Sequence, residues 1–286
     1  GFAQAEVIVE GRYSTEAVHQ AYIEPHACIA SAGADGQCHI ISSSQGHFMI
    51  RAYVAKLLGM EMSNLKVTPA EIGGGFGGKT VVYLEPLALA MARKTGRAVK
   101  MVMTREDVFR ATGPTSGAVI EVKIGATRDG TITAAQAVLK YQAGAFAGSP
   151  VQPGCMCAFA MYDLKNVDVT GYDVVSNRPK VAAYRAPGAP IASFAAESAI
   201  DDLALKLGMD PIALREKNAA KAGTKTVYGV TFPEIGFEQV LTAAKNHPHW
   251  KAPLGPNQGR GFATGFWFNI GGESSASVFV NEDGSV

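Results

Sequence analysis

The run Gly73-Gly74-Gly75-Phe76-Gly77-Gly78-Lys79 places five glycines around one aromatic residue. It follows a strand-like segment, residues 65–68, and precedes an amphipathic helical segment that ends at Gly96. Glycine lacks a Cβ atom, so its backbone can take positive φ and bring successive amides close to ligand oxygens, with Phe76 wedged against the ligand. The run therefore predicts a strand-to-helix loop that holds an anionic or oxo ligand. The alternative is a glycine-rich turn that only permits close packing.

Residues 73–80 also fit the phosphate-binding pattern G-x-x-x-x-G-K-[ST], which is typical of nucleoside triphosphatases. In such a loop the Lys-Thr pair begins the helix, so Pro86 would lie in the second turn, remove a backbone donor and cost ~3 kcal/mol. Pro86 is tolerated if the helix begins near Glu85 instead. The sequence also has no obvious apolar strand ending in an Asp that could hold magnesium. A P-loop nucleotide triphosphatase is kept as the alternative from another functional class.

Strands and helices alternate irregularly along the rest of the chain. Hydrophobic spacing predicts strands at 7–13, 26–32, 37–42, 65–68, 99–103, 118–124, 132–139 and 167–175. It predicts helices within 50–58, 84–95, 200–207, 210–218 and 237–245. The pair Gln45-Gly46 then lies at another strand-to-helix turn, and 183–190, with two prolines and a glycine, is expected to follow a fixed, non-repetitive path. We expect an α+β fold of mixed sheets with packed helices.

Residues 248–259, with three prolines and two glycines, form the best candidate domain boundary. We expect a first domain at 1–247, and at 248–286 a linker with the first strands of a second, truncated domain. Residues 277–280 alternate like a strand, and Asp283-Gly284 is typical of a hairpin turn after which a return strand should follow. The sequence is therefore expected to be a piece of a longer polypeptide.

Composition excludes several classes of partner. The 286 residues are 47% hydrophobic and carry a formal net charge of +1, which favours neither nucleic acid nor an anionic membrane as a partner. No apolar run reaches the ~20 residues of a membrane span. The four cysteines and six histidines form no zinc or iron-sulfur pattern, so no direct metal ligand is predicted. The cysteines are interpreted as buried thiols of a reducing compartment, by default the cytoplasm.

Three separated motifs, Gln45-Gly46, Gly73 to Lys79 and Ala183 to Pro190, occur in an order that resembles the xanthine oxidase family of molybdenum hydroxylases. This family includes xanthine dehydrogenases, aldehyde oxidoreductases, carbon monoxide dehydrogenases and 4-hydroxybenzoyl-CoA reductases. The resemblance extends over nearly all of the chain. Shorter matches at 24–26, 92–97, 104–107 and 259–261 support it.

The resemblance implies a molybdopterin cofactor whose dithiolene sulfurs hold the metal, so that the protein need supply no metal ligand. Gln45 would hydrogen-bond an oxo or pterin oxygen, and the Phe76 and Gly77 amides would face the oxo groups or the pterin. Arg185 is the implied catalytic residue, because its permanent charge would lie where negative charge develops on the substrate. The remaining implied cofactor-binding residues are Gly46, Gly74, Gly75 and Gly78.

The implied reaction is hydroxylation of an aldehyde or N-heteroaromatic carbon with water-derived oxygen. Electrons would pass to 2Fe-2S and FAD centres on other domains or subunits, and the remainder of the same polypeptide would complete the site. Reductive dehydroxylation of an aryl-CoA thioester, as in 4-hydroxybenzoyl-CoA reductase, is the alternative within the family. A cofactor-free scaffold fragment is a further alternative.

Three departures from the family pattern limit these implications. Thr80 stands where purine-hydroxylating members have Glu, which disfavours xanthine as the substrate, and Ala219 replaces an aromatic residue of purine-type pockets. The family's general base, a Glu in a Gly-Glu motif, is expected beyond Val286, because Glu273 lies too early in the sequence. We therefore expect residues 1–286 to fold but to be inactive alone.

Overall fold

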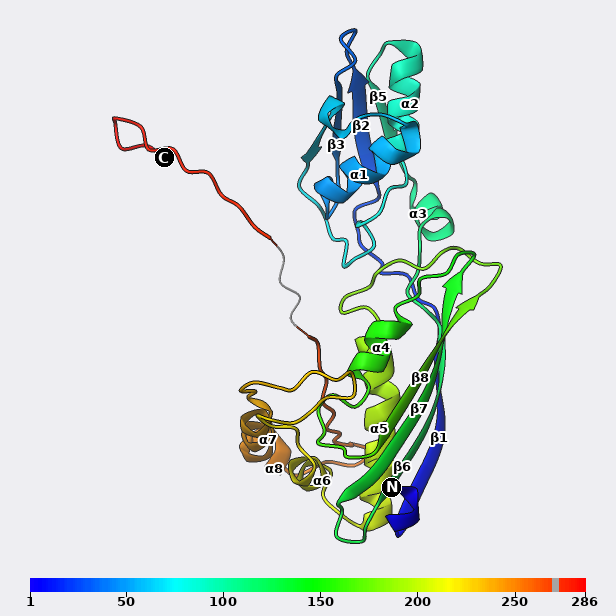
Figure 1. Ribbon diagram of the computed structural model, residues 1–286, viewed down its shortest axis with the longest axis vertical. Coiled ribbons are helices and arrows are strands. Elements are labelled where there is room, and N and C mark those ends of the chain that lie inside the picture. The colour runs from blue at the N-terminus through cyan, green and yellow to red at the C-terminus, as the bar shows by residue number, and fades with distance from the viewer. Residues whose placement is uncertain (269–272) are drawn as a thin grey trace.

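The computed structural model describes residues 1–268 and 273–286, and its regular elements form two lobes (Figure 1). The lobe drawn at the top is built on a four-stranded sheet of order β4-β3-β2-β5. Strand β3 pairs with β4 in parallel and with β2 antiparallel, and β2 pairs antiparallel with β5. The elements of this lobe are β2 (Ala27–Ala32), β3 (Cys38–Ser42), α1 (His47–Leu58), η2 (Met62–Asn64), β4 (Leu65–Pro69), α2 (Glu85–Thr95) and β5 (Val99–Val102).

Helices α1 and α2 form one apolar core with this sheet. Ile40 of β3, Ile50 and Val54 of α1, and Leu89 of α2 are completely buried in it. Helix α3 (Arg105–Ala111) then leads the chain toward the second lobe (Figure 1). The ends of β3 and β4 thus bring two loops, 43–46 and 70–84, to the same end of the lobe.

The second lobe contains a sheet of order β1-β6-β7-β8, in which only β7 and β8 pair in parallel. Helix α5 packs against β1 and β6 and against α4, which lies in the crossover between β7 and β8 (Figure 1). The core includes Ile124, Leu139, Tyr141, Ile200 and Leu203. The elements are η1 (Phe2–Gln4), β1 (Val7–Thr15), β6 (Ala118–Ala126), β7 (Ile132–Gly144), α4 (Val151–Cys157), β8 (Val167–Val175), α5 (Ala189–Leu207), α6 (Pro211–Lys217), α7 (Phe237–Asn246) and α8 (Pro248–Lys251).

The predicted α+β class is confirmed, and the glycines that end helices have the expected geometry. Gly59, Gly96 and Gly208 take left-handed φ of 60°, 65° and 66° after α1, α2 and α5. Helix α2 begins at Glu85 with Pro86 in its first turn, as the sequence requires. None of the helices in the described parts of the chain combines the length and apolar character needed to cross a bilayer.

Two details of the predicted elements were wrong. Helix α5 begins at Ala189, so the non-repetitive path ends two residues earlier than expected, because Pro190 fits the first helical turn. Residues 277–280 form no strand, since within the described residues no strand pairs with them and a strand needs a partner ladder. The turn that follows is present: the Gly284 amide donates to the Asn281 carbonyl at 3.0 Å.

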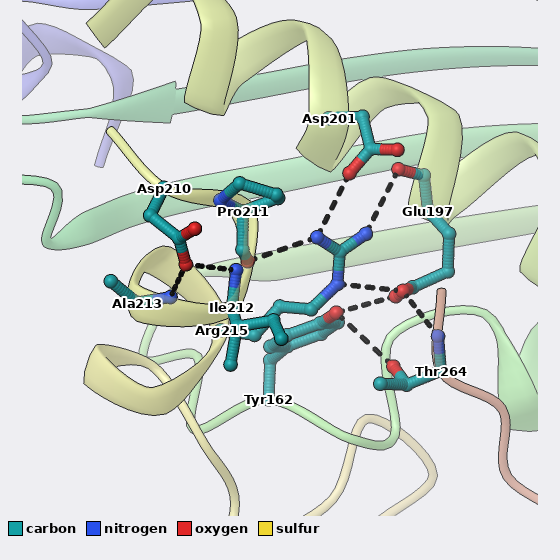
Figure 2. A network of polar contacts seen from close by, with 9 residues as sticks. All are labelled: Tyr162, Glu197, Asp201, Asp210, Pro211, Ile212, Ala213, Arg215 and Thr264. Carbon is teal, nitrogen blue, oxygen red and sulfur yellow. Dashed lines mark hydrogen bonds and ion pairs between the residues drawn. The ribbon is translucent and has the colours of Figure 1, made fainter. Parts of the chain in front are cut away.

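A buried polar network joins α5, α6 and the segment after residue 259 (Figure 2). Arg215 of α6 is completely buried and lies 2.9 Å from the Glu197 carboxylate and 2.8 Å from Asp201. Glu197 also accepts hydrogen bonds from the Tyr162 hydroxyl and, at 2.7 Å, from the Thr264 amide. Part of 248–286, the predicted linker and second domain, is therefore held against the second lobe, and Asn269 to Gly272 lie outside the described residues. The division into 1–247 and 248–286 stays a prediction.

Candidate cofactor-binding site

The glycine loop lies where three segments that are distant in sequence meet. The Arg185 amide donates to the Phe76 carbonyl at 2.8 Å, which attaches the loop to the segment that precedes α5. Gln20, between β1 and β2, donates through Nε2 to the Ala183 carbonyl at 2.9 Å across 163 residues of sequence. The side chain of Gln45, which precedes α1, also contacts the loop, because its Oε1 accepts the Gly77 amide. The structure thus brings together the three motifs that the sequence separates.

Close packing explains several of the glycines. A Cβ atom at Gly77 would lie 2.6 Å from the Ala183 carbonyl oxygen, and one at Gly78 would lie 2.7 Å from the Tyr22 ring. A Cβ atom at Gly75 would overlap the side-chain oxygen of Gln45. Gly74 and Gly77 also take φ of +96° and +105°, where side chains are strained. Close packing and positive φ therefore both require glycine in this loop, and its role in holding a ligand stays a prediction.

The tip of the loop carries backbone donors that are not used within the described residues. Phe76 takes a φ of +51°, unusual for a residue with a side chain, and is 46% exposed. The amides of Gly74, Gly75 and Phe76 have no acceptor among the described residues. Strained backbone beside unpaired amides is typical of a ligand site.

Gln45 is oriented by the loop itself. Its Oε1 accepts hydrogen bonds from the Gly77 amide at 2.8 Å and the Lys79 amide at 3.1 Å. Because Oε1 is fixed in this way, Nε2 is the outward group, and it has no acceptor among the described residues. The Gly77 amide is used within the protein, unlike the Phe76 amide, so the structure does not leave it facing a ligand as the sequence implies. Gly46 caps α1, where its carbonyl accepts from Ile50 at 2.9 Å.

The lysine of the loop does not serve as a phosphate ligand. Lys79 is completely buried, and its Nζ lies 2.6 Å from the Glu24 carboxylate. The Thr80 hydroxyl donates back to the Gly77 carbonyl at 2.8 Å, and the next helix begins only at Glu85. A phosphate-binding loop needs its Lys and Thr at the helix start and directed toward the nucleotide. This geometry excludes the P-loop alternative.

Arg185 lies beside the loop tip and is exposed. No carboxylate among the described residues lies within 4.0 Å of its guanidinium group, so a structural salt bridge does not explain it there. The next residue, Ala186, takes a φ of +53°, and Gly188 one of +87° before α5 begins. This irregular path fixes the Arg185 backbone against Phe76.

Comparison with known proteins identifies the family. Residues 1–219 match the family model described as the molybdopterin cofactor-binding domain. The chain belongs to this family. It is 31% identical over 248 residues to the nicotinate dehydrogenase large molybdopterin subunit of Eubacterium barkeri, covering 85% of this chain and 58% of that subunit. It is 32% identical to the aldehyde oxidoreductase of Megalodesulfovibrio gigas, covering 100% of this chain and 33% of that enzyme.

A solved structure of the aldehyde oxidoreductase from Desulfovibrio gigas superposes with a TM-score of 0.83 at 31% identity, over 87% of this chain and 28% of that one. These matches confirm the predicted relationship to the xanthine oxidase family of molybdenum oxidoreductases and the fold of its molybdopterin-binding domain. The chain spans 58% of the length of the first of these relatives and 33% of the second.

The residues at the loop of this molybdopterin-binding domain fit an oxygen-rich cofactor. The unpaired amides at the loop tip, Gln45 Nε2 and the Arg185 guanidinium group are all donors. Ser44 Oγ and Gln20 Oε1 are buried without a partner among the described residues, which leaves further capacity for hydrogen bonds. Within the same residues, no three His, Cys, Asp or Glu side chains are grouped to hold a metal ion.

The sequence did not reveal the inner side of this site. The loop is held by Gln20, Tyr22 and Glu24, which lie in a segment where the sequence showed only a short family match at Glu24-Pro25-His26. A buried lysine in the loop needs a carboxylate partner, but sequence spacing does not identify which carboxylate it is.

Ala219, which replaces an aromatic residue of purine-type pockets, packs in an apolar cluster with Phe237 and Leu241.

His26 is buried beside Tyr22 and is expected to make the stability of the molybdopterin-binding domain depend on pH. Burial, with the neighbouring charges of Lys79 and His19, lowers the pKa of its imidazole to about 4. In the unfolded chain the pKa is about 6.5, so between these values the unfolded state binds more protons. The free energy of unfolding should therefore fall by up to about 3 kcal/mol as the pH drops from 6.5 toward 4.

Urea denaturation between pH 7.5 and pH 4.5 measures this slope. His26→Gln removes the titrating group and can keep a hydrogen bond to the Tyr22 hydroxyl, which lies 2.6 Å from His26 Nε2. The free energy of unfolding of this variant should change clearly less with pH than that of the wild type. An unchanged slope in His26→Gln would show that other groups cause the acid sensitivity.

Proposed function

We propose that this domain holds the cofactor of a molybdenum hydroxylase that oxidises an aldehyde or an N-heteroaromatic carbon. In this reaction a substrate C–H bond is replaced by a C–OH bond, the oxygen comes from water, and two electrons and two protons leave. The bound molybdopterin would supply the two-electron redox chemistry. The names of the relatives, a nicotinate dehydrogenase subunit and an aldehyde oxidoreductase, support both substrate classes.

The observation that carries the proposal is the set of unpaired donors at one place. The loop-tip amides from Gly74 to Phe76, the outward Nε2 of Gln45 and the guanidinium group of Arg185 all belong to segments joined by direct hydrogen bonds. Donors fixed in this way bind oxo groups or pterin oxygens without first reorganising. Gln45 and the loop tip are assigned to cofactor binding.

Arg185 is assigned to the substrate. Its guanidinium group keeps its positive charge at any physiological pH and can stabilise negative charge that develops on the substrate during oxidation. Its backbone amide is bound to the Phe76 carbonyl, so the residue lies beside the cofactor-binding loop.

Arg185→Ala in the full-length enzyme should lower kcat/KM by roughly 10²-fold or more, because a charge that stabilises the transition state is lost. Cofactor content should stay unchanged, since the Arg185 contact with the loop is made by the backbone. Steady-state kinetics with an aldehyde and with an N-heteroaromatic substrate, together with molybdenum analysis, provide the measurement. Wild-type kinetics in this variant would remove Arg185 from the site.

The rest of the enzyme is expected to supply what this domain lacks. We assign the general base to a carboxylate outside residues 1–286, and electron transfer to 2Fe-2S and FAD centres on other domains or subunits. Residues 1–286 alone are therefore expected to fold without turnover. Stoichiometric molybdenum with oxidation activity in this piece would contradict the assignment.

A further inference from the structure

Glu24 closes the glycine loop into a ring. Its Oε2 accepts the amide of Gly73, the first residue of the loop, at 2.8 Å. The same oxygen accepts the ammonium group of Lys79, the last residue, at 2.6 Å. The Glu24 amide donates back to the Gly73 carbonyl at 3.2 Å. One carboxylate oxygen therefore joins both ends of the seven-residue loop.

The charge on Lys79 makes this closure depend on Glu24. The Lys79 side chain is 0% exposed, and its Nζ lies 5.1 Å from the centre of the buried Tyr22 ring. Within the described residues, Glu24 is the only carboxylate that Lys79 reaches. The hydrogen bonds from Lys79 and Gly73 outweigh partial burial and lower the pKa of the Glu24 carboxyl, so it is ionised at neutral pH. A buried ammonium group left without its carboxylate is strongly unfavourable.

The ring determines which amides of the loop are left without a partner. The amides of Gly73, Gly77 and Lys79 are taken by Glu24 and Gln45, and the Gly78 amide donates to the Gly75 carbonyl at 2.7 Å. Gln45 adds its own backbone bond from its amide to the Lys79 carbonyl at 2.9 Å. With both ends fixed, the amides of Gly74, Gly75 and Phe76 are the ones of the seven loop amides that have no acceptor among the described residues.

We propose that Glu24 is a positioning residue for the cofactor: by neutralising Lys79 and holding Gly73, it fixes the direction of the amides at 74–76. Glu24 itself acts through the loop and need not touch the cofactor. The inference rests on the proposed function, because it assigns the purpose of these amides to cofactor binding.

The test compares Glu24→Gln with the double variant Glu24→Gln/Lys79→Met in the full-length enzyme. Gln keeps the size of Glu24 and an oxygen that can accept from Gly73, but it leaves the Lys79 charge buried without its counterion. The double variant removes both charges at nearly constant volume, which is far less costly than removing one. The readouts are backbone hydrogen exchange of peptides covering 71–82 in cofactor-free protein, and molybdenum content after expression with cofactor.

In Glu24→Gln, exchange over 71–82 should be at least about tenfold faster while peptides from β6 and β7 exchange as in the wild type, and molybdenum content should fall by a similar factor. In the double variant, loop protection should recover most of the way. Wild-type exchange in Glu24→Gln, or equally fast exchange in both variants, would overturn the positioning role. Faster exchange with full molybdenum content would instead contradict the proposed cofactor role of the loop. Should Glu24→Gln fail to fold, the double variant is measured alone. Slow exchange over 71–82 in that variant supports the positioning role, and fast exchange in a folded double variant overturns it.

Discussion

Gly77→Ala is expected to leave the full-length enzyme with less than about a tenth of its molybdopterin. The residue takes a φ of +105°, and its new Cβ atom would lie 2.6 Å from the carbonyl oxygen of Ala183. That oxygen is backbone and cannot rotate away, because it accepts a hydrogen bond from Gln20 while the nearby Arg185 amide is bound to Phe76. The loop must therefore shift, and its shift breaks the bond from the Gly77 amide to Gln45.

Gly148→Ala separates backbone strain from this clash. Gly148 has a similar φ of +109°, but its nearest atom would be the end of the flexible Lys180 side chain at 3.6 Å. The Gly148→Ala variant should therefore lose some stability and keep its cofactor. Molybdenum analysis and the pterin absorbance of both purified variants give the comparison. Equal cofactor loss in the two variants, or none in Gly77→Ala, would show that the contact with Ala183 does not control the site.

Arg215→Met should lower the free energy of unfolding by about 3–5 kcal/mol, because it leaves the buried Glu197 carboxylate without its counterion. The loss is not confined to one contact. Arg215 also bonds the Pro211 carbonyl at 3.0 Å, and Glu197 holds the Tyr162 hydroxyl and the Thr264 amide (Figure 2). Chemical denaturation at pH 7 measures the difference.

The matched double variant Glu197→Leu/Arg215→Met tests the electrostatic cause. Two apolar side chains of similar volume remove both buried charges together, so the double variant should be more stable than Arg215→Met. Part of the loss will remain, since the Thr264 amide then lacks its acceptor. The single variant Glu197→Leu is measured as well. If the double variant loses as much free energy of unfolding as the two single variants together, packing and not charge gives the network its stability.

Local signals in the sequence predicted most of the elements. Hydrophobic spacing with a terminating glycine found α1, α2 and α5, because both signals act within a few residues of the helix end. Helices α3 and α4 were missed, and so was the four-residue α8, which lies in the predicted linker. The first is short, although Thr104 and Asp107 form a capping box that marks its start, and the second contains Pro153 and Gly154, which are poor helix formers.

Pairings over long sequence distances could not be predicted in the same way. Strand β1 pairs with β6, which begins at Ala118, and no local pattern specifies such a partner. The same limit applies to the candidate site. The sequence indicated the glycine loop, Gln45 and Arg185, but the use of the Gly77 amide depends on a side chain 32 residues away, and the closure of the loop depends on Glu24, 49 residues from Gly73.

The bond between Gln20 and Ala183 sets a condition on biosynthesis. A nascent chain carries the glycine loop early, but the segment against which that loop rests leaves the ribosome more than a hundred residues later. Until then the loop has no Ala183 or Arg185 beside it, whatever the state of the first lobe. The site described here is therefore complete only after translation has passed Arg185.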